Sequence, residues 1–155
     1  MQHEKTCECR LCQLKETMSD DEALAVYQRQ QMEMLVKYGW FAHYVSDDPD
    51  APLGVNFHTH GMDETYDHPD LQIVFPIEPK IAHSLFWEAV NQIKGGKKFR
   101  AGDVVDKIVG NGFSVKFVEA QENERTVLRM ILPDKHGHLE QNDLTGKMAE
   151  QYGGI

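Results

Sequence analysis

The chain has 155 residues, of which 41% are apolar, and its 25 acidic and 16 basic side chains give a net charge of −9. This length and composition are typical of one globular domain with its own core and exclude a disordered or collagen-like chain. The negative charge, with a pI near 5.3, argues against nucleic acids and anionic membranes as partners.

No stretch approaches the roughly 18 apolar residues that a membrane span needs, and the first 20 residues lack the apolar segment of a signal peptide. All three cysteines fall within residues 7–12, unlike the spread, paired cysteines of a secreted disulfide protein. We therefore expect a cytoplasmic protein in a reducing compartment.

The first element is a polar, cysteine-rich leader, residues 1–18, ahead of a single predicted domain, residues 19–155. Its cysteines form a C-x-C-x-x-C cluster with a histidine four residues upstream. Thiolates this close repel one another unless a cation neutralises them, and Zn²⁺ takes four sulfur or nitrogen ligands. The leader therefore predicts a structural zinc site with the ligands His3, Cys7, Cys9 and Cys12. The alternative is a disordered leader with three thiols, or a transient disulfide between Cys9 and Cys12.

A long helix is predicted to follow the leader. Ser19 and Glu22 have the S-x-x-E spacing of a capping box, which places the start of the helix at this point. Apolar residues recur at helical spacing as far as Tyr38, and Gly39 is placed to end the helix in the left-handed conformation.

Two strands are predicted next, at residues 40–45 and 53–60, separated by a loop rich in aspartate and proline that cannot continue a strand. Residues of the second strand alternate, so that one set faces a core and the other set faces away. The core set is Leu53, Val55, Phe57 and Thr59, and the opposite set is Gly54, Asn56, His58 and His60.

His58 and His60 form an H-x-H pair whose side chains project side by side, which is the geometry that two imidazoles need to share a metal ion. Asp63 and His68 follow within ten positions and complete the predicted pocket. The alternative is a solvated polar strand face with two exposed histidines. Two ligands are well placed but no third is evident, which favours a shallow polar pocket without a tightly held metal.

The second half of the chain predicts one long helix, four strands and a closing helix. The long helix begins at a proline, ends at a glycine pair and carries an apolar stripe, and a Gly-Asn-Gly turn joins two of the strands. The strands are expected at 71–75, 103–109, 113–119 and 126–132, the long helix at 79–94 and the closing helix from Asn142 or Asp143. Because regular β-α-β alternation is absent, we expect an α+β fold, with an antiparallel sheet of about five to six strands and helices packed mainly on one face.

Five short motifs occur in a fixed order between about Tyr38 and Asp143. They are Gly39-Trp40, His60-Gly61, His68-Pro69-Asp70-Leu71, Phe99-x-x-Gly102 and Leu132-Pro133-Asp134. Their order and spacing resemble the uncharacterised bacterial family called domain of unknown function 4262 (DUF4262), and the cysteine-bearing leader resembles a subgroup feature. The resemblance implies a compact α+β domain and no catalytic residue, since the family has no established activity.

Two classes of function follow from these patterns. The first is a small cytosolic metal-binding protein that acts as a binding or interaction module, with structural zinc at the leader. The second is a metal-dependent hydrolase that uses His58, His60 and either His68 or Asp63, with a bound water as nucleophile. No phosphate-binding glycine loop, serine-hydrolase elbow or dinucleotide fingerprint occurs in the sequence. The sequence names no partner and allows a homo-oligomer.

Overall fold

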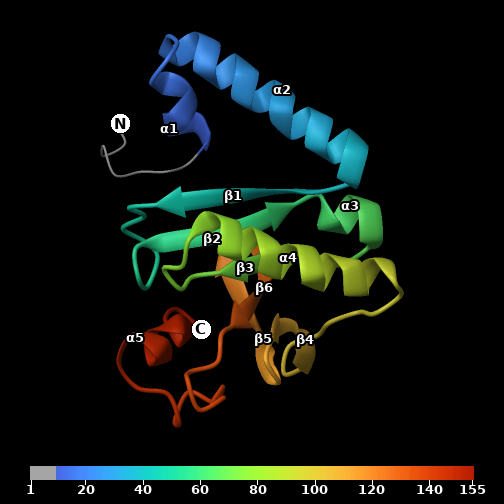
Figure 1. Cartoon of the computed structure of the whole chain (residues 1–155), viewed down its shortest axis with the longest axis vertical. Helices are drawn as coiled ribbons and strands as arrows, with labels where there is room; N and C mark the ends of the chain where they lie inside the picture. Colours follow the sequence, from blue (N-terminus) through green and yellow to red (C-terminus); the bar gives the residue numbers. More distant parts are fainter. Residues whose placement is uncertain (1–9) are drawn as a thin grey trace.

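The structure is a computed structural model that describes residues 10–155. Its centre is one sheet of six strands: β1 (Phe41–Ser46), β2 (Val55–His60), β3 (Leu71–Ile73), β4 (Val104–Gly110), β5 (Phe113–Glu122) and β6 (Arg125–Ile131). They lie in the order β1-β2-β3-β6-β5-β4, and all neighbours are antiparallel except β3 and β6 (Figure 1). The α+β class and the mostly antiparallel sheet are therefore confirmed.

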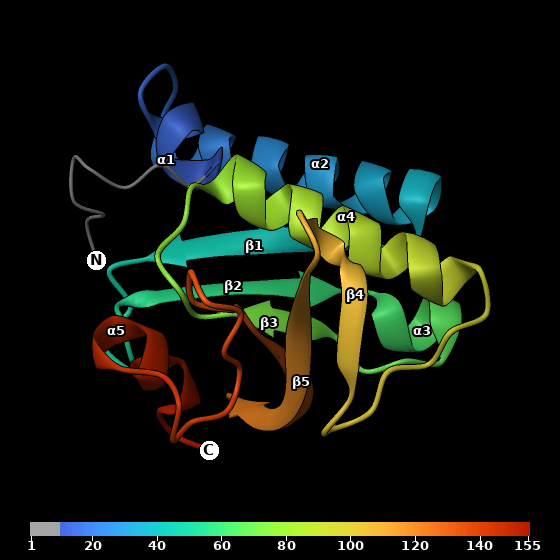
Figure 2. The ribbon, with the colours of Figure 1, turned by 60° about the horizontal axis from the view of Figure 1, so that its bottom comes forward.

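Five α-helices and a final 3₁₀ turn surround this sheet in the described part of the chain. They are α1 (Arg10–Lys15), α2 (Asp20–Tyr38), α3 (Met62–Tyr66), α4 (Pro79–Lys94), α5 (Gly146–Ala149) and η1 (Glu150–Tyr152). Helix α2 runs beside the edge strand β1, whereas α4 and α5 lie on opposite sides of the sheet (Figure 2). No helix within residues 10–155 is long and apolar enough to cross a membrane.

Helix α2 begins and ends where its sequence predicts. The Ser19 hydroxyl accepts a hydrogen bond from the backbone N–H of Glu22 at 3.3 Å, which satisfies one of the free donors of the first turn. Gly39 ends the helix with a φ of 82°, and its N–H donates to the carbonyl of Leu35. A Cβ atom at Gly39 would lie 2.4 Å from Thr65 Cγ2, so the approach of α3 also requires glycine.

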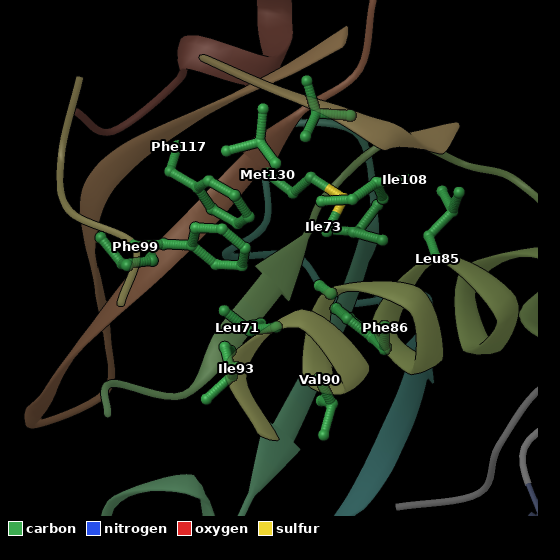
Figure 3. Close-up of a cluster of buried hydrophobic side chains, with 14 of the residues drawn as sticks. Leu71, Ile73, Leu85, Phe86, Val90, Ile93, Phe99, Ile108, Phe117 and Met130 are labelled. Carbon is green, nitrogen blue, oxygen red and sulfur yellow. The ribbon is translucent and has the colours of Figure 1, made fainter. Parts of the chain in front are cut away.

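The main core lies between α4 and the sheet. Ile73 and Phe117 of the sheet face this helix, and Phe86 and Val90 of α4 pack against the sheet (Figure 3). All four are at most 1% exposed, and full burial of such a side chain contributes about 1.5–3 kcal/mol. The contacts of β2 bear out its predicted alternation, since Phe57 belongs to this core whereas the rings of His58 and His60 contact each other.

The opposite side of the sheet carries a second, smaller apolar cluster under the C-terminal segment. It consists of Val118, Ile131, Leu144 and Tyr152, with partly buried neighbours around it. The closing helix was expected from residue 142 or 143 but begins at Gly146, after Thr145. Backbone turns at residues 140–144 occupy the predicted start, since the N–H of Leu144 donates to the carbonyl of Glu140 at 3.2 Å.

Helix α3 and the turn after β5 are the main features that the sequence did not predict. Helix α3 has five residues, which are too few to show a helical period in the sequence. It is held at its start by Asp70, whose Oδ1 accepts a hydrogen bond from the N–H of Met62 at 3.2 Å. Strand β5 continues to Glu122 rather than residue 119, and Asn123 with a φ of 55° makes a tight turn into β6. This turn carries Glu122 and Arg125 to the site described below.

Candidate metal centre

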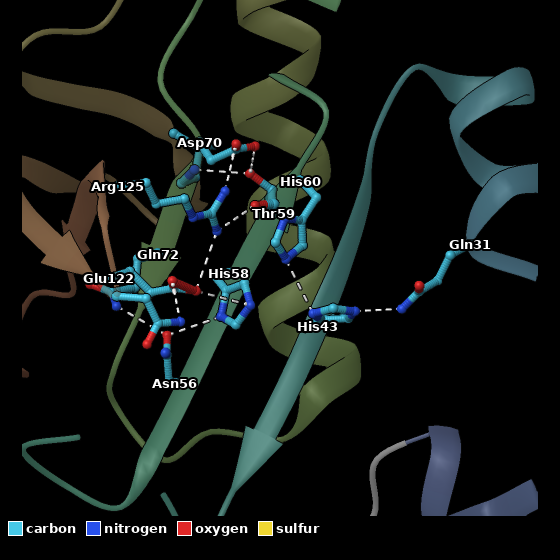
Figure 4. A network of polar contacts seen from close by, with 12 residues as sticks. Gln31, His43, Asn56, His58, Thr59, His60, Asp70, Gln72, Glu122 and Arg125 are labelled. Carbon is cyan, nitrogen blue, oxygen red and sulfur yellow. Dashed lines mark hydrogen bonds and ion pairs between the residues drawn. The ribbon is translucent and has the colours of Figure 1, made fainter. Parts of the chain in front are cut away.

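Three histidines meet on the face of the sheet that points away from α4. The register pairs His43 of β1 directly with His58 of β2, and His60 follows two residues later on the same face of β2. One nitrogen of each ring lies within 4.8 Å of the others. The three imidazoles therefore form one cluster, to which two neighbouring strands contribute (Figure 4).

The ring contacts within this histidine cluster are close. His60 Nε2 lies 3.2 Å from His43 Nδ1, and the rings of His58 and His60 are 5.0 Å apart at their centroids. Two nitrogens bound to one tetrahedral Zn²⁺ are separated by roughly 3.3 Å, given bonds of 2.0–2.1 Å. The side-chain amide nitrogen of Gln31, on α2, contacts Nε2 of His43. A metal ion on Nδ1 requires this amide to be turned over, so that its oxygen accepts from Nε2–H.

The surroundings favour the neutral form of all three imidazoles. Burial, together with the positive charge that its neighbours would carry, lowers the pKa of His58 to about 3. Burial is also the main cause that lowers the pKa of His43 to about 4, with a further contribution from His60. The pKa of His60 falls to about 4 through burial and the charge of Arg125. Neutral rings keep a lone pair, which a metal ion requires.

A chain of hydrogen bonds fixes which nitrogen of His58 carries the proton. The guanidinium of Arg129 can only donate, and its Nε–H bonds Gln72 Oε1 at 2.8 Å. Gln72 Nε2 then donates to Asn56 Oδ1 at 3.0 Å, so this oxygen is an acceptor for His58 Nδ1 at 3.1 Å. The proton of neutral His58 therefore lies on Nδ1, and Nε2 carries the lone pair.

Glu122 supplies an oxygen opposite that lone pair. Its Oε1 lies 3.2 Å from His58 Nε2, and both side chains are almost fully buried. Without a proton or a cation close to both atoms, two lone pairs face each other at this distance, which is unfavourable in a buried place. The low pKa of His58 disfavours a proton on Nε2. The residues present therefore fit a divalent cation beside His58.

Arg125 joins this cluster to the start of β3. It donates to Asp70 Oδ2 at 2.7 Å and to the carbonyl of Thr59 at 3.0 Å, and it lies 3.5 Å from Glu122 Oε1. The other oxygen of Asp70 accepts from the Thr59 hydroxyl at 2.9 Å. These contacts hold Glu122 and the end of β2 in fixed positions and leave Asp70 with a charged partner.

The histidine cluster opens onto a cleft of about 1000 Å³. One wall is the acidic loop between β1 and β2, with Asp47, Asp48 and Asp50, and another is the turn between β5 and β6. Side chains of the sheet complete the lining, among them Asn56, Gln72 and Arg129. A small molecule that enters this cleft meets the histidines, two arginines and several carboxylates, of which Glu122 lies beside the histidine cluster.

The other two residues of the predicted pocket lie apart from this cluster. His68 is buried elsewhere, where its Nε2 accepts a hydrogen bond from the N–H of Phe99 at 3.0 Å. Asp63 is exposed in the first turn of α3. Both line a second hollow that also touches His60. Within residues 10–155, neither side chain lies close enough to the three histidines to share a metal ion with them.

The predicted zinc site of the leader stays a prediction. His3, Cys7 and Cys9 lie outside the described residues. Cys12 lies on α1 and is half-buried. Leu14 of the same helix is 6% exposed, so part of the leader packs against the rest of the protein.

Three residues of the site were missed by sequence reasoning: His43, Glu122 and Arg125. A signal for His43 was present, because a hairpin between the two predicted strands brings residue 43 opposite residue 58. No comparable signal marked Glu122 or Arg125, since they reach the site only because β6 pairs with β3.

Comparison with known proteins gives one family. The sequence model of a family described as domain of unknown function (DUF4262) matches residues 34–141, which include the histidine cluster, Glu122 and Arg125. No curated protein and no solved structure matches the chain.

Proposed function

The chain belongs to the DUF4262 family, whose description states no activity, and from the histidine cluster we propose that it is a metal-dependent hydrolase with a zinc-class ion. The ion is held by His43, His58 and His60. One observation carries the proposal: three neutral imidazole nitrogens converge within 4.8 Å at the side of an open cleft. Imidazole is a good ligand for zinc and its neighbours in the first transition row.

The number of ligands favours catalysis over a structural role. Structural zinc sites are closed by four protein ligands, whereas catalytic sites use three and keep one position open for water or substrate. Three neutral histidines leave the full double charge on the ion, which lowers the pKa of a bound water to about 7. Glu122, beside His58, is placed to accept the proton of that water.

The zinc site of the leader is a separate proposal for the same chain. Its ligands, His3, Cys7, Cys9 and Cys12, would form a closed four-ligand shell with a structural role. The two sites differ in their ligands, so substitutions separate them. If both are occupied, we expect two metal ions per chain, and a Cys9→Ser variant should keep the ion at the histidine cluster.

Metal binding tests the proposal directly. Metal-free protein carrying Cys9→Ser is titrated with Zn²⁺ by calorimetry and with Co²⁺ by visible spectroscopy, which reports tetrahedral coordination. We expect one ion per chain, and a loss of affinity of more than about a hundredfold in His43→Ala, beyond the effect of typical outer-shell changes. The control is His83→Ala. His83 is a half-buried histidine of α4 whose ring is hydrogen-bonded to Tyr44 and lies outside the histidine cluster.

Two outcomes would contradict the proposal at different levels. Equal affinity in His43→Ala and His83→Ala would show that the ion is not held by the histidine cluster. A loaded protein that hydrolyses no p-nitrophenyl ester of acetate or phosphate, and whose Co²⁺ spectrum does not change with pH near 7, would remove the hydrolase assignment. That second result would leave a metal-binding protein without an activated water.

A further inference from the structure

Arg129 is a buried cation held only by neutral groups. It is 4% exposed, and its Nε donates to Gln72 Oε1 at 2.8 Å. Its Nη1 donates to the carbonyls of Gln151 at 2.8 Å and Gly153 at 2.7 Å. Within residues 10–155 it forms no ion pair, and burial without a compensating acid lowers its pKa to about 10.

Arg125, in the same cleft, shows the usual arrangement. It is paired with Asp70 at 2.7 Å and lies 3.5 Å from Glu122, so carboxylates offset its charge. An uncompensated buried charge costs several kcal/mol, and natural proteins rarely keep one without a partner. We therefore expect an anion from outside the described residues to offset the charge of Arg129.

The free end of Arg129 faces the cleft. Nη2 makes no hydrogen bond to any described residue, and the side chain lines the same cleft as the histidine cluster. In the described part of the chain, Arg125 Nε is the one fully buried side-chain nitrogen or oxygen that lacks a hydrogen-bond partner. Because Nη2 of Arg129 also lacks a partner, it is not fully buried. Nη2 is therefore accessible to a ligand in the cleft.

The sheet places this donor close to the metal centre. His58 pairs with Gln72 across β2 and β3, and Gln72 pairs with Arg129 across β3 and β6, so all three side chains share one face. Two strand spacings separate the backbones of His58 and Arg129 by about 10 Å. Because both side chains extend into the cleft, one small molecule can reach both.

We propose that Arg129 binds an oxyanion of the substrate, a carboxylate or phosphate group, through Nη2 while the bond to be hydrolysed lies at the histidine cluster. This inference rests on the proposed function for its second half. The acidic loop with Asp47, Asp48 and Asp50 lines the same cleft and repels a polyanion. The substrate class is therefore a small molecule with one anionic group, not a nucleoside triphosphate or a nucleic acid.

The test is anion binding, measured with and without metal. Inorganic phosphate and acetate are titrated separately into metal-free and Zn²⁺-loaded protein by calorimetry, for wild type, Arg129→Gln and the control Arg100→Gln. Arg100 is exposed and lies outside the cleft. Arg100→Gln therefore removes the same charge as Arg129→Gln without changing the lining of the cleft. We expect the affinity for the anion to fall by about tenfold or more in Arg129→Gln and to stay at the wild-type value in Arg100→Gln. The arm with the greater dependence on Arg129 identifies the class of anion.

The metal-free arm separates this inference from the proposed function. If the chain binds no zinc but still binds an anion in an Arg129-dependent way, the metal proposal fails and the oxyanion site stands. If zinc binds normally and Arg129→Gln takes up both anions as wild type does, the oxyanion site is refuted and the metal centre stands. A wild-type protein that binds neither anion also refutes it.

Arg129→Gln also removes the two Nη1 hydrogen bonds to carbonyls of the C-terminal segment, which weakens the attachment of that segment. A measurement on wild type avoids this problem. The Nε–H of Arg129 is hydrogen-bonded and buried, so its NMR signal is protected from exchange with water. We expect added phosphate or acetate to shift this signal in a saturable way, and an unchanged signal would overturn the proposal.

Discussion

His43 Nδ1 and His60 Nε2 lie 3.2 Å apart although the two residues are diagonal neighbours on β1 and β2, not register partners. The direct partner of His43 is His58, and that of His60 is Phe41. Pleating puts all three histidines on one face, and the diagonal closes the triangle. A shift of β1 by one residue would turn His43 to the opposite face and abolish the cluster.

The first prediction concerns the tautomer of His58. Asn56→Leu removes the acceptor of Nδ1–H, so the proton is free to move to Nε2 and compete with the metal. We expect zinc affinity to fall by about 10–100-fold, as for other outer-shell changes, with no ligand removed. Asn56→Asp keeps an acceptor oxygen and should restore most of the affinity. Calorimetric titration of both variants checks this, and equal losses in both would contradict a role in positioning the proton.

The second prediction concerns Glu122 as a general base. Glu122→Gln keeps the shape of the side chain but cannot take up a proton. With the zinc-loaded protein and an ester that it turns over, we expect kcat to fall by about 10²–10⁴-fold while KM changes little. Glu124→Gln, two residues further along the chain and in the lining of the same cleft, is the matched control. If kcat is unchanged in Glu122→Gln, another group accepts the proton.

The third prediction concerns the stability of the Asp70 network. Asp70→Asn leaves Arg125 without its closest charged partner and weakens the contact with Thr59. Loss of one partner from a buried pair costs 3–5 kcal/mol, and the partial exposure of Arg125 reduces the expected loss to about 2–3 kcal/mol. Urea denaturation measures this free energy of unfolding. The exposed Asp63→Asn should change it by less than about 0.5 kcal/mol, and equal effects would contradict the assignment.

The fourth prediction concerns pH and His68. Its Nδ1–H donates to the carbonyl of Pro69, and its Nε2 accepts from the N–H of Phe99, so only the neutral ring fits. Burial, the first cause, lowers its pKa below 6.5 in the folded protein. The unfolded chain then binds a proton near pH 6.5 that the folded chain does not, so stability falls as the pH drops from 6.5 toward the folded pKa.

His68→Gln isolates that contribution, because glutamine offers Phe99 an acceptor oxygen but does not titrate. In chelator-treated protein, we expect the stability advantage of wild type over His68→Gln to shrink as the pH falls below 6.5. The histidine cluster titrates equally in both proteins, so the difference reports His68 alone. A difference that stays constant from pH 7.5 to about 4.5 would show that His68 is not held neutral.

Local patterns in the sequence predicted much of the fold. The Ser19 cap and Gly39 fixed the ends of α2, and alternation in β2 put Phe57 inside and His58 and His60 on the other face. These features depend on residues close together in the chain, where propensity and periodicity act. The strand ends and the closing helix were less well predicted, since tertiary contacts set them.

The sequence by itself determined the α+β class, the family and the face on which His58 and His60 lie. Only the tertiary structure decided that His58 is buried and that the histidines form a cluster at the side of a cleft. Pairing of β1 with β2 adds His43, and the parallel pairing of β3 with β6 brings Arg129 into register with Gln72. These two pairings join residues 15 and 57 positions apart, and they are chosen by burial of the whole sheet rather than by local preference.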